Sequence, residues 1–169
     1  MNVVNQETAK MWFPDILKNN KEDSPMVGIL ITGHGHFATG LASSLQLITG
    51  ITENVALVDF EADHSTDTLK ANLHKAMDSL KECEGILVLS DLAGGSPFNN
   101  ASMCKAERPE QKIEVLAGTN LPMVIEGASM MTAFDDPLEL AETLIATGKD
   151  YIVRFELVKH EDDSDEDGI

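Results

Sequence analysis

Residues 27–35 read Val27-Gly28-Ile29-Leu30-Ile31-Thr32-Gly33-His34-Gly35, a short apolar run that ends in a histidine between two glycines. A continuous apolar run of this length is typical of a parallel strand that helices cover on both faces. The flanking glycines allow another molecule to approach the imidazole of His34 closely. The stretch therefore predicts a buried strand whose carboxyl end carries a histidine placed for chemistry.

A second apolar run, residues 85–90, ends in the same way. Asp91 follows it directly, and the glycine-rich turn Leu92-Ala93-Gly94-Gly95-Ser96-Pro97 comes next. Open α/β sheets bind ligands just outside the carboxyl ends of their strands. The two runs thus bring a histidine and an aspartate to the same edge of the predicted sheet.

Strand-like and helix-like segments alternate along the chain with short connections, which is typical of an α/β domain. We predict a doubly wound, mostly parallel sheet in the order 2-1-3-4, with helices on both faces. The last segment, 151–158, alternates apolar with charged residues and is predicted to be a C-terminal edge strand, antiparallel to the others. The expected strands are 27–32, 55–60, 85–90, 113–118 and 151–158, and the expected helices are about 36–48, 65–81, 97–107, 121–131 and 137–147.

Length and composition favour one globular domain: the chain has 169 residues, of which 43% are hydrophobic. The polar residues 1–25 end at Ser24-Pro25 and are interpreted as an N-terminal extension. The domain is expected to span 26–158. An acidic tail, 159–169, follows it.

The formal net charge of -17 argues against nucleic acid and against anionic membranes as partners. The two cysteines, Cys83 and Cys104, have no CxxC spacing, and no apolar run approaches the roughly 20 residues that span a bilayer. We therefore expect a cytoplasmic protein.

In a 2-1-3-4 sheet the first and third strands are neighbours, so His34 and Asp91 flank one crevice. The carboxylate would accept one ring N–H and leave the other nitrogen free as a nucleophile or base. Ser96 is predicted to cap a helix whose first residue is Pro97, and helix N-termini bind anions. Ser96 and the amides of the turns at Gly35 and Gly95 are thus expected to hold a phosphoryl group on His34.

A purely structural interpretation stays open for each of these residues. His34 alone is compatible with a structural role, Asp91 with a helix cap, and Ser96 with an N-cap only. His36 and His64, with Asp63, lack the spacing of a zinc motif, so neither a metal nor a cofactor is expected.

Two rival functions use the same residues. Residues 33–40 imitate a dinucleotide-binding fingerprint, followed by Asp59, but the third glycine comes two places late. His34, Asp91 and Ser96 are also the residue types of a hydrolase triad, although Ser96 does not lie in a GxSxG motif. The alternatives are therefore a nucleotide-binding module and a Ser-His-Asp hydrolase.

Three motifs in order, residues 30–35, 90–99 and 115–123, resemble the IIA component of the mannose family of the bacterial phosphoenolpyruvate-dependent sugar phosphotransferase system. The resemblance covers about residues 26–158. It implies a phosphocarrier in which His34 takes a phosphoryl group from the phosphohistidine of HPr and donates it to a IIB component. The resemblance further implies that the IIB component phosphorylates the sugar that enters through the IIC and IID membrane subunits.

The resemblance also implies roles for individual residues. Asp91 would hydrogen-bond His34, Ser96 would help to bind the phosphoryl group, and the last strand would cross to the partner in a homodimer. His36 stands where mannose-specific members carry an aromatic residue, and the absence of a fused IIB domain implies a separate IIB polypeptide. The motifs 32–40 and 117–121 look most like the N-acetylgalactosamine or galactosamine branch.

Overall fold

The computed structural model describes residues 26–157, which form four strands, five α-helices and one 3-10 helix. The strands are β1 (Val27–His34), β2 (Val55–Phe60), β3 (Gly85–Ser90) and β4 (Lys112–Leu116). The helices are α2 (Phe37–Thr49), α3 (Thr66–Ser79), α4 (Ser96–Ala106), α5 (Leu121–Met130), η1 (Met131–Ala133) and α6 (Pro137–Asp150).

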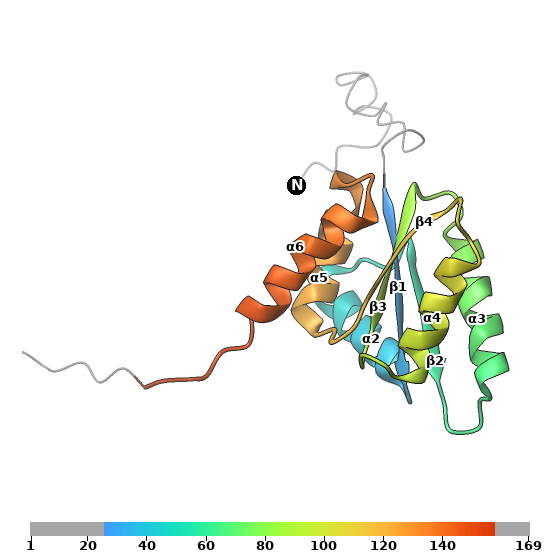
Figure 1. Cartoon of the computed structure of the whole chain (residues 1–169). Helices are drawn as coiled ribbons and strands as arrows, with labels where there is room; N and C mark the ends of the chain where they lie inside the picture. Colours follow the sequence, from blue (N-terminus) through green and yellow to red (C-terminus); the bar gives the residue numbers. More distant parts are fainter. Residues whose placement is uncertain (1–25, 158–169) are drawn as a thin grey trace, which may run out of the picture.

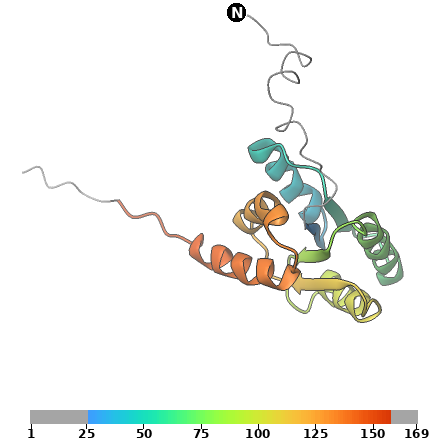
Figure 2. The same ribbon diagram turned by 90° about the horizontal axis from the view of Figure 1, so that it is seen from above.

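The four strands make one parallel sheet in the order β2-β1-β3-β4. Helices α2, α5 and α6 cover one face, and α3 and α4 cover the other (Figure 1). Seen from above in Figure 2, the sheet lies between these two layers. The predicted α/β class, strand order and double layer of helices are confirmed.

The sheet separates two apolar cores. Alternate residues of β1 point to opposite faces, so Ile29 and Ile31 join the core under α2, α5 and α6, whereas Leu30 joins the core under α3 and α4. All six residues of β3 are buried. This explains why the inner strands read as unbroken apolar runs in the sequence.

The pairing of β1 with β3 sets the position of the candidate site. Thr32 lies opposite Ser90, so the chain reaches His34 and Asp91 within two residues of the same level of the sheet. His34 is the last residue of β1, and Asp91 directly follows β3. Both side chains thus lie at the edge where the parallel strands end.

The edge strand predicted over 151–158 is not seen in the single chain. Residues 151–157 form no strand and leave the body after α6 as an extended segment (Figures 1 and 2). None of the four strands described between residues 26 and 157 pairs with them. Their apolar side chains are 67–86% exposed, namely Tyr151, Ile152, Val153, Phe155 and Leu157. Exchange of this segment within a dimer stays a prediction.

The predicted N-terminal extension, 1–25, and acidic tail, 159–169, lie outside the described residues, as does Val158. Between residues 26 and 157, none of the helices has the length and apolar character needed to cross a membrane.

Candidate functional site

His34 and Asp91 form a direct pair at the carboxyl edge of the sheet. The Nδ1 atom of His34 lies 2.7 Å from Oδ2 of Asp91, and the backbone N–H of His34 donates to the same oxygen at 2.8 Å. The imidazole is 46% exposed and the carboxylate 16%. The aspartate therefore holds both the backbone and the ring of a histidine that solvent and partners can reach.

The hydrogen bonds of Asp91 fix its charge and the tautomer of His34. Burial of Asp91 opposes ionisation, but hydrogen bonds from the backbone and ring of His34, together with the Leu92 N–H, lower the pKa of Asp91 below its usual value. An ionised carboxylate only accepts hydrogen bonds, so Nδ1 of His34 carries the proton. The lone pair of Nε2 is then available to an incoming electrophile.

Two further groups confine the imidazole. The ring of Phe60 meets it edge to face, with centroids 5.8 Å apart. On Gly95, a Cβ atom would lie 2.9 Å from Cε1 of His34, so only glycine leaves room for the ring there. Asp91, Phe60 and Gly95 thus restrict His34 to one orientation.

Helix α4 begins beside this ring, and its first turn differs from the prediction. Gly95, not Ser96, is the N-cap residue, and Ser96 and Pro97 are the first two helical residues. No side chain caps the helix. The first intrahelical bond runs from Asn99 N–H to the Gly95 carbonyl, so the N–H groups of Ser96 and Phe98 have no partner among the described residues. These free amides are suited to an anion.

The expected contribution of Gly35 to phosphoryl binding stays a prediction. Its N–H donates to the carbonyl of Phe60 at 2.8 Å, and the N–H of His34 is bound by Asp91. The turn after β1 therefore has neither of these amides free for a phosphoryl oxygen. Gly35 has a φ of 58°, a left-handed conformation that glycine adopts without strain and that shapes this turn.

Asp59 occupies the N-terminus of the neighbouring helix, α2. Its Oδ1 accepts the N–H groups of Ala38 and Thr39, and its Oδ2 accepts the Thr39 hydroxyl. His36 Nδ1 lies 3.6 Å from the same carboxylate. In the nucleotide-binding alternative these amides would receive a pyrophosphate, but here a carboxylate already fills that place.

The hydrolase alternative requires a hydrogen bond between the serine hydroxyl and the histidine. Among the hydrogen bonds within residues 26–157, none joins the Ser96 hydroxyl to His34. Ser96 lies in the first turn of α4 rather than at a sharp strand-to-helix elbow. The pair of His34 and Asp91 therefore has no serine nucleophile attached to it.

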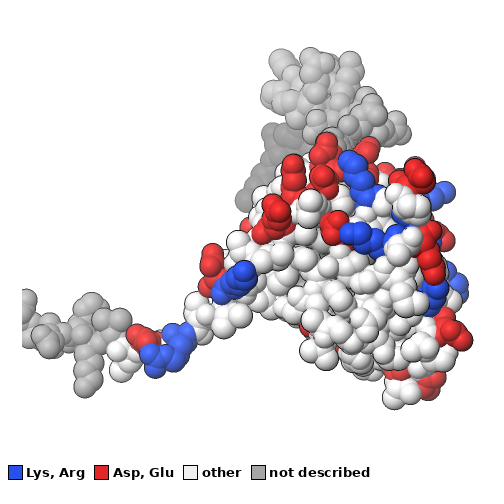
Figure 3. Space-filling view, viewed as in Figure 1, with Lys and Arg blue, Asp and Glu red and all other residues white. Residues whose placement is uncertain are grey.

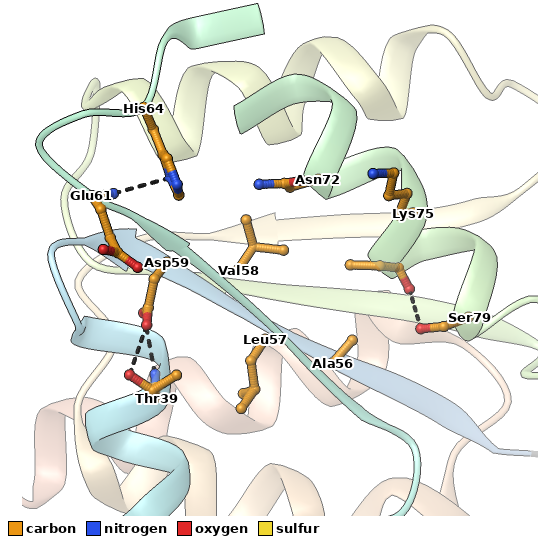
Figure 4. Close-up of a pocket in the computed structure, with 11 residues that line it drawn as sticks. Thr39, Ala56, Leu57, Val58, Asp59, Glu61, His64, Asn72, Lys75 and Ser79 are labelled. Carbon is orange, nitrogen blue, oxygen red and sulfur yellow. Dashed lines mark hydrogen bonds between the residues drawn. The ribbon is translucent and has the colours of Figure 1, made fainter. Parts of the chain in front are cut away.

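A groove of about 490 Å³ follows the open edge of β2, but it does not include His34, Asp91 or Ser96. In Figure 4 its floor is formed by β2, and Asn72, Lys75 and Ser79 of α3 line one wall. His64 lies at one end, where its Nδ1 accepts the N–H of Glu61. Between residues 26 and 157 no group of three or more His, Cys, Asp or Glu is arranged to hold a metal ion.

The sequence did not identify Phe60 or Leu92 as part of this site. The contact of Phe60 with His34 follows from the register of β2, in which Phe60 lies opposite His34. Leu92, the residue after Asp91, donates its N–H to that carboxylate and leaves its own side chain 61% exposed. The sequence signal for a site residue here is a polar residue directly after a strand. An apolar residue at such a place carries no comparable signal.

Comparison with known proteins places this geometry in a family. A family model described as "PTS system fructose IIA component" matches residues 28–145. The chain is 34% identical to the fructose-specific EIIA component of the phosphotransferase system (PTS) of Bacillus subtilis, over 62% of this chain and 70% of that protein. It is also 34% identical to the mannose-specific EIIAB component of Escherichia coli, over 73% of this chain, and matches only 38% of that longer protein.

Solved structures agree with the sequence matches. The EIIA component of the phosphotransferase system from Streptococcus agalactiae is 36% identical and has a TM-score of 0.71, with 76% of this chain and 97% of that chain covered. A mannose/sorbose-specific IIA subunit from Enterococcus faecalis is 29% identical, with a TM-score of 0.70 and coverage of 82% and 99%. The chain therefore belongs to the mannose-type IIA family of the bacterial sugar phosphotransferase system.

Proposed function

We propose that this chain is a phosphocarrier that accepts a phosphoryl group from phospho-HPr on Nε2 of His34 and donates it to a separate IIB component. Membership of the IIA family supports a role in coupled sugar uptake and phosphorylation. The observation that carries the assignment to His34 is its hydrogen bond to Asp91 beside the uncapped N-terminus of α4.

The proposed step is a displacement at phosphorus. The Nε2 lone pair of His34 forms a new N–P bond as the N–P bond of the donor breaks, and that bond's electron pair leaves with the donor imidazole. The proton on Nδ1 stays in place, and the Asp91 carboxylate stabilises the positive charge that the ring acquires. Transfer to IIB reverses these roles, since the electron pair returns to Nε2.

The phosphoryl oxygens need donors while the group is on His34. The free N–H groups of Ser96 and Phe98, at the positive end of α4, are proposed to bind them, with the hydroxyl of Ser96 as a further donor. Gly95 leaves the space that the ring and the phosphoryl group require. Phosphoryl transfer depends mainly on such positioning and charge stabilisation, which these groups are proposed to supply.

Incubation with labelled phosphoenolpyruvate, enzyme I and HPr tests the proposal. We expect one acid-labile, base-stable label on His34, and we expect the label to move on when IIB is added. A base-labile ester on Ser96, or an unlabelled chain in a mixture that labels HPr, would reject it.

We also propose that the chain is a homodimer in which the segment 151–158 of each copy joins the sheet of the other. The described part of this segment exposes five large apolar side chains, and β4 pairs with β3 alone, which leaves one edge open. Pairing there would satisfy both the open edge and the exposed side chains. A chain ending at Asp150 should sediment as a monomer at concentrations where the full chain is a dimer.

For the transported sugar, we propose N-acetylgalactosamine or galactosamine, on the similarity of residues 32–40 and 117–121 to that branch. We place the reaction in the cytoplasm, where HPr and IIB would meet the chain, with IIC and IID as indirect partners. Uptake assays in cells lacking their own IIA test the sugar: the chain should restore growth with the IIB, IIC and IID of that branch.

A further inference from the structure

A groove of about 550 Å³ lies at the end of the sheet where the strands begin, opposite the edge that carries His34. The loop between α2 and β2 lines one side of it with Ile51 and Asn54, and the end of α5 and the start of η1 line the other. Met26, the first residue that the structure describes, lines it as well. The volume of this groove is in the range of ligand-binding pockets.

Much of the lining of this groove is apolar. Ala128 and Met131 are 2% and 6% exposed, and Ile51 packs against the core under α2, α5 and α6. Ser129 and Thr132 line the groove from exposed positions. An apolar side chain placed in the groove would leave water and would stabilise the fold by doing so.

The chain that precedes Met26 enters at this groove. The carbonyl of Met26 accepts the N–H of Glu84 at 2.9 Å, and its Sδ lies 3.4 Å from Nδ2 of Asn54, so the point of entry is fixed. We call residues 11–17 the apolar segment; they read Met11-Trp12-Phe13-Pro14-Asp15-Ile16-Leu17. Eight residues, 18–25, separate it from Met26, and they span at most about 30 Å. The apolar segment is therefore tethered within reach of the groove, at a high effective concentration.

Charge also favours the apolar segment as the occupant. Lys10 and Lys18 flank it and Asp15 is the only acid among them, so residues 10–18 have a formal net charge of +1 in a chain of -17. In Figure 3, Asp and Glu side chains gather around the end of the molecule where the strands begin. Residues 161–169 hold six acids and no Lys or Arg, so the acidic tail would be repelled from the same end.

We propose that the apolar segment docks in this groove of its own chain, with the ring of Trp12 between Ile51 and Met131. Tryptophan is enriched among the residues that anchor protein contacts, because it buries a large, mostly apolar surface. The family model matches residues 28–145, so the apolar segment precedes the matched domain. The inference is independent of the proposed function, since the groove and His34 lie at opposite ends of the sheet.

The fluorescence of Trp12 tests the proposal, because the chain has no other tryptophan. In the full chain we expect emission at a shorter wavelength, and weaker quenching by acrylamide, than in the same chain unfolded in urea. Ser129→Glu places a charge in the groove from an exposed position, and a docked ring would have to bury that charge. This variant should therefore lose both the wavelength shift and the protection from acrylamide, while circular dichroism shows that it is folded.

The matched control is Ser79→Glu. Ser79, like Ser129, is an exposed serine in the last turn of a helix, and each donates its hydroxyl to a backbone carbonyl of its own helix. Ser79 lines the groove along β2 instead, so its variant should keep the wild-type emission. Emission of the wild type like that of the unfolded chain, or equal emission of the two variants, would overturn the proposal.

Methyl resonances of methionine locate the ring of Trp12. In the full chain with ¹³C-labelled methionine methyl groups, the ring should shift the resonances of Met26 and Met131, and Trp12→Ala should remove these shifts. Met77, buried under α3 on the other face of the sheet, should keep its position in both chains. Resonances of Met26 and Met131 that do not respond to Trp12→Ala would contradict docking in this groove.

Dilution of the full chain distinguishes its own segment from that of a second copy. Protection of Trp12 from acrylamide should be independent of protein concentration if the segment and the groove belong to one chain. Protection that is lost on dilution would assign the segment to the groove of another copy and would overturn the proposal.

Discussion

The N-termini of α2 and α4 lie at the same edge of the sheet and follow neighbouring strands, yet they differ in whether a side chain caps them. At α2, the carboxylate of Asp59 accepts the N–H groups of Ala38 and Thr39. At α4, no side chain caps the helix, and the ring of His34 lies against Gly95 instead. The first terminus already holds its anion, and the second leaves donors free for one that arrives from outside.

Each terminus also has a histidine near an aspartate, which makes the comparison testable residue by residue. His34 lies 2.7 Å from Asp91, whereas His36 is 77% exposed and 3.6 Å from Asp59. Only the first pair faces free helix amides. The difference indicates that the empty helix terminus, rather than the pairing of histidine with aspartate, distinguishes the reactive site.

Replacing the two histidines has the largest expected effect. His34→Ala should abolish acceptance of phosphorus, because the nucleophile is removed, while the fold persists because the side chain is half-exposed. His36→Ala should keep the transfer rate within about twofold, as expected for an exposed ion pair. Transfer is measured with labelled phosphoenolpyruvate and folding by circular dichroism. Full transfer by His34→Ala would remove the central assignment.

Replacing the two aspartates should separate transfer from stability. Asp91→Asn presents a partner that cannot fix the tautomer in the same way, so transfer in rapid-quench measurements should slow by about 100-fold or more. Asp59→Asn should transfer normally and lose about 0.5–1 kcal/mol of unfolding free energy at the α2 terminus. Equal transfer rates in the two variants would show that Asp91 is only a cap.

Replacing a glycine at each terminus probes the space around it. Gly95→Ala places a methyl group 2.9 Å from the imidazole and 3.2 Å from the Leu92 carbonyl, so the ring must shift and transfer should fall by about tenfold or more. Gly40→Ala meets nothing within 4 Å in helix α2 and should raise the unfolding free energy by about 0.5–1 kcal/mol. A Gly95→Ala variant with the wild-type rate would contradict the close fit.

The smallest expected effect concerns acid. The pKa of Asp91 is lower in the folded chain than its usual value, so the stability that its ionisation contributes is present at neutral pH. It should be lost as the pH falls below the ordinary carboxyl pKa and through the lowered one. Urea unfolding of the wild type and of Asp91→Asn should therefore differ most at neutral pH and converge in acid. A difference independent of pH would exclude this linkage.

Most of the fold was predictable because helices cover both faces of the inner strands. That burial makes runs such as 85–90 continuously apolar, and the turns after them are rich in glycine. The segment 151–158 is a different case. Its alternating pattern is that of a half-buried strand, but the pattern does not tell which chain supplies the neighbouring strand.

The pairing of His34 with Asp91 was predictable as well, because strand order alone makes β1 and β3 neighbours. The details at α4 were not. Ser96 and Gly95 are both acceptable N-cap residues, and the choice depends on the backbone of Gly95, with φ -69° and ψ 163°. The Phe60 contact depends on side-chain packing across β1 and β2, which no local pattern reports.

The position of the phosphorus atom on the chain distinguishes Nε2 of His34 from every other acceptor. The chain is labelled with ¹⁵N in its histidine rings, phosphorylated by phosphoenolpyruvate, enzyme I and HPr, and studied by ³¹P–¹⁵N correlation spectroscopy. We expect one phosphorus bonded to Nε2 of His34, with the proton retained on Nδ1. Phosphorus on Nδ1, on another histidine or on Ser96 would contradict it.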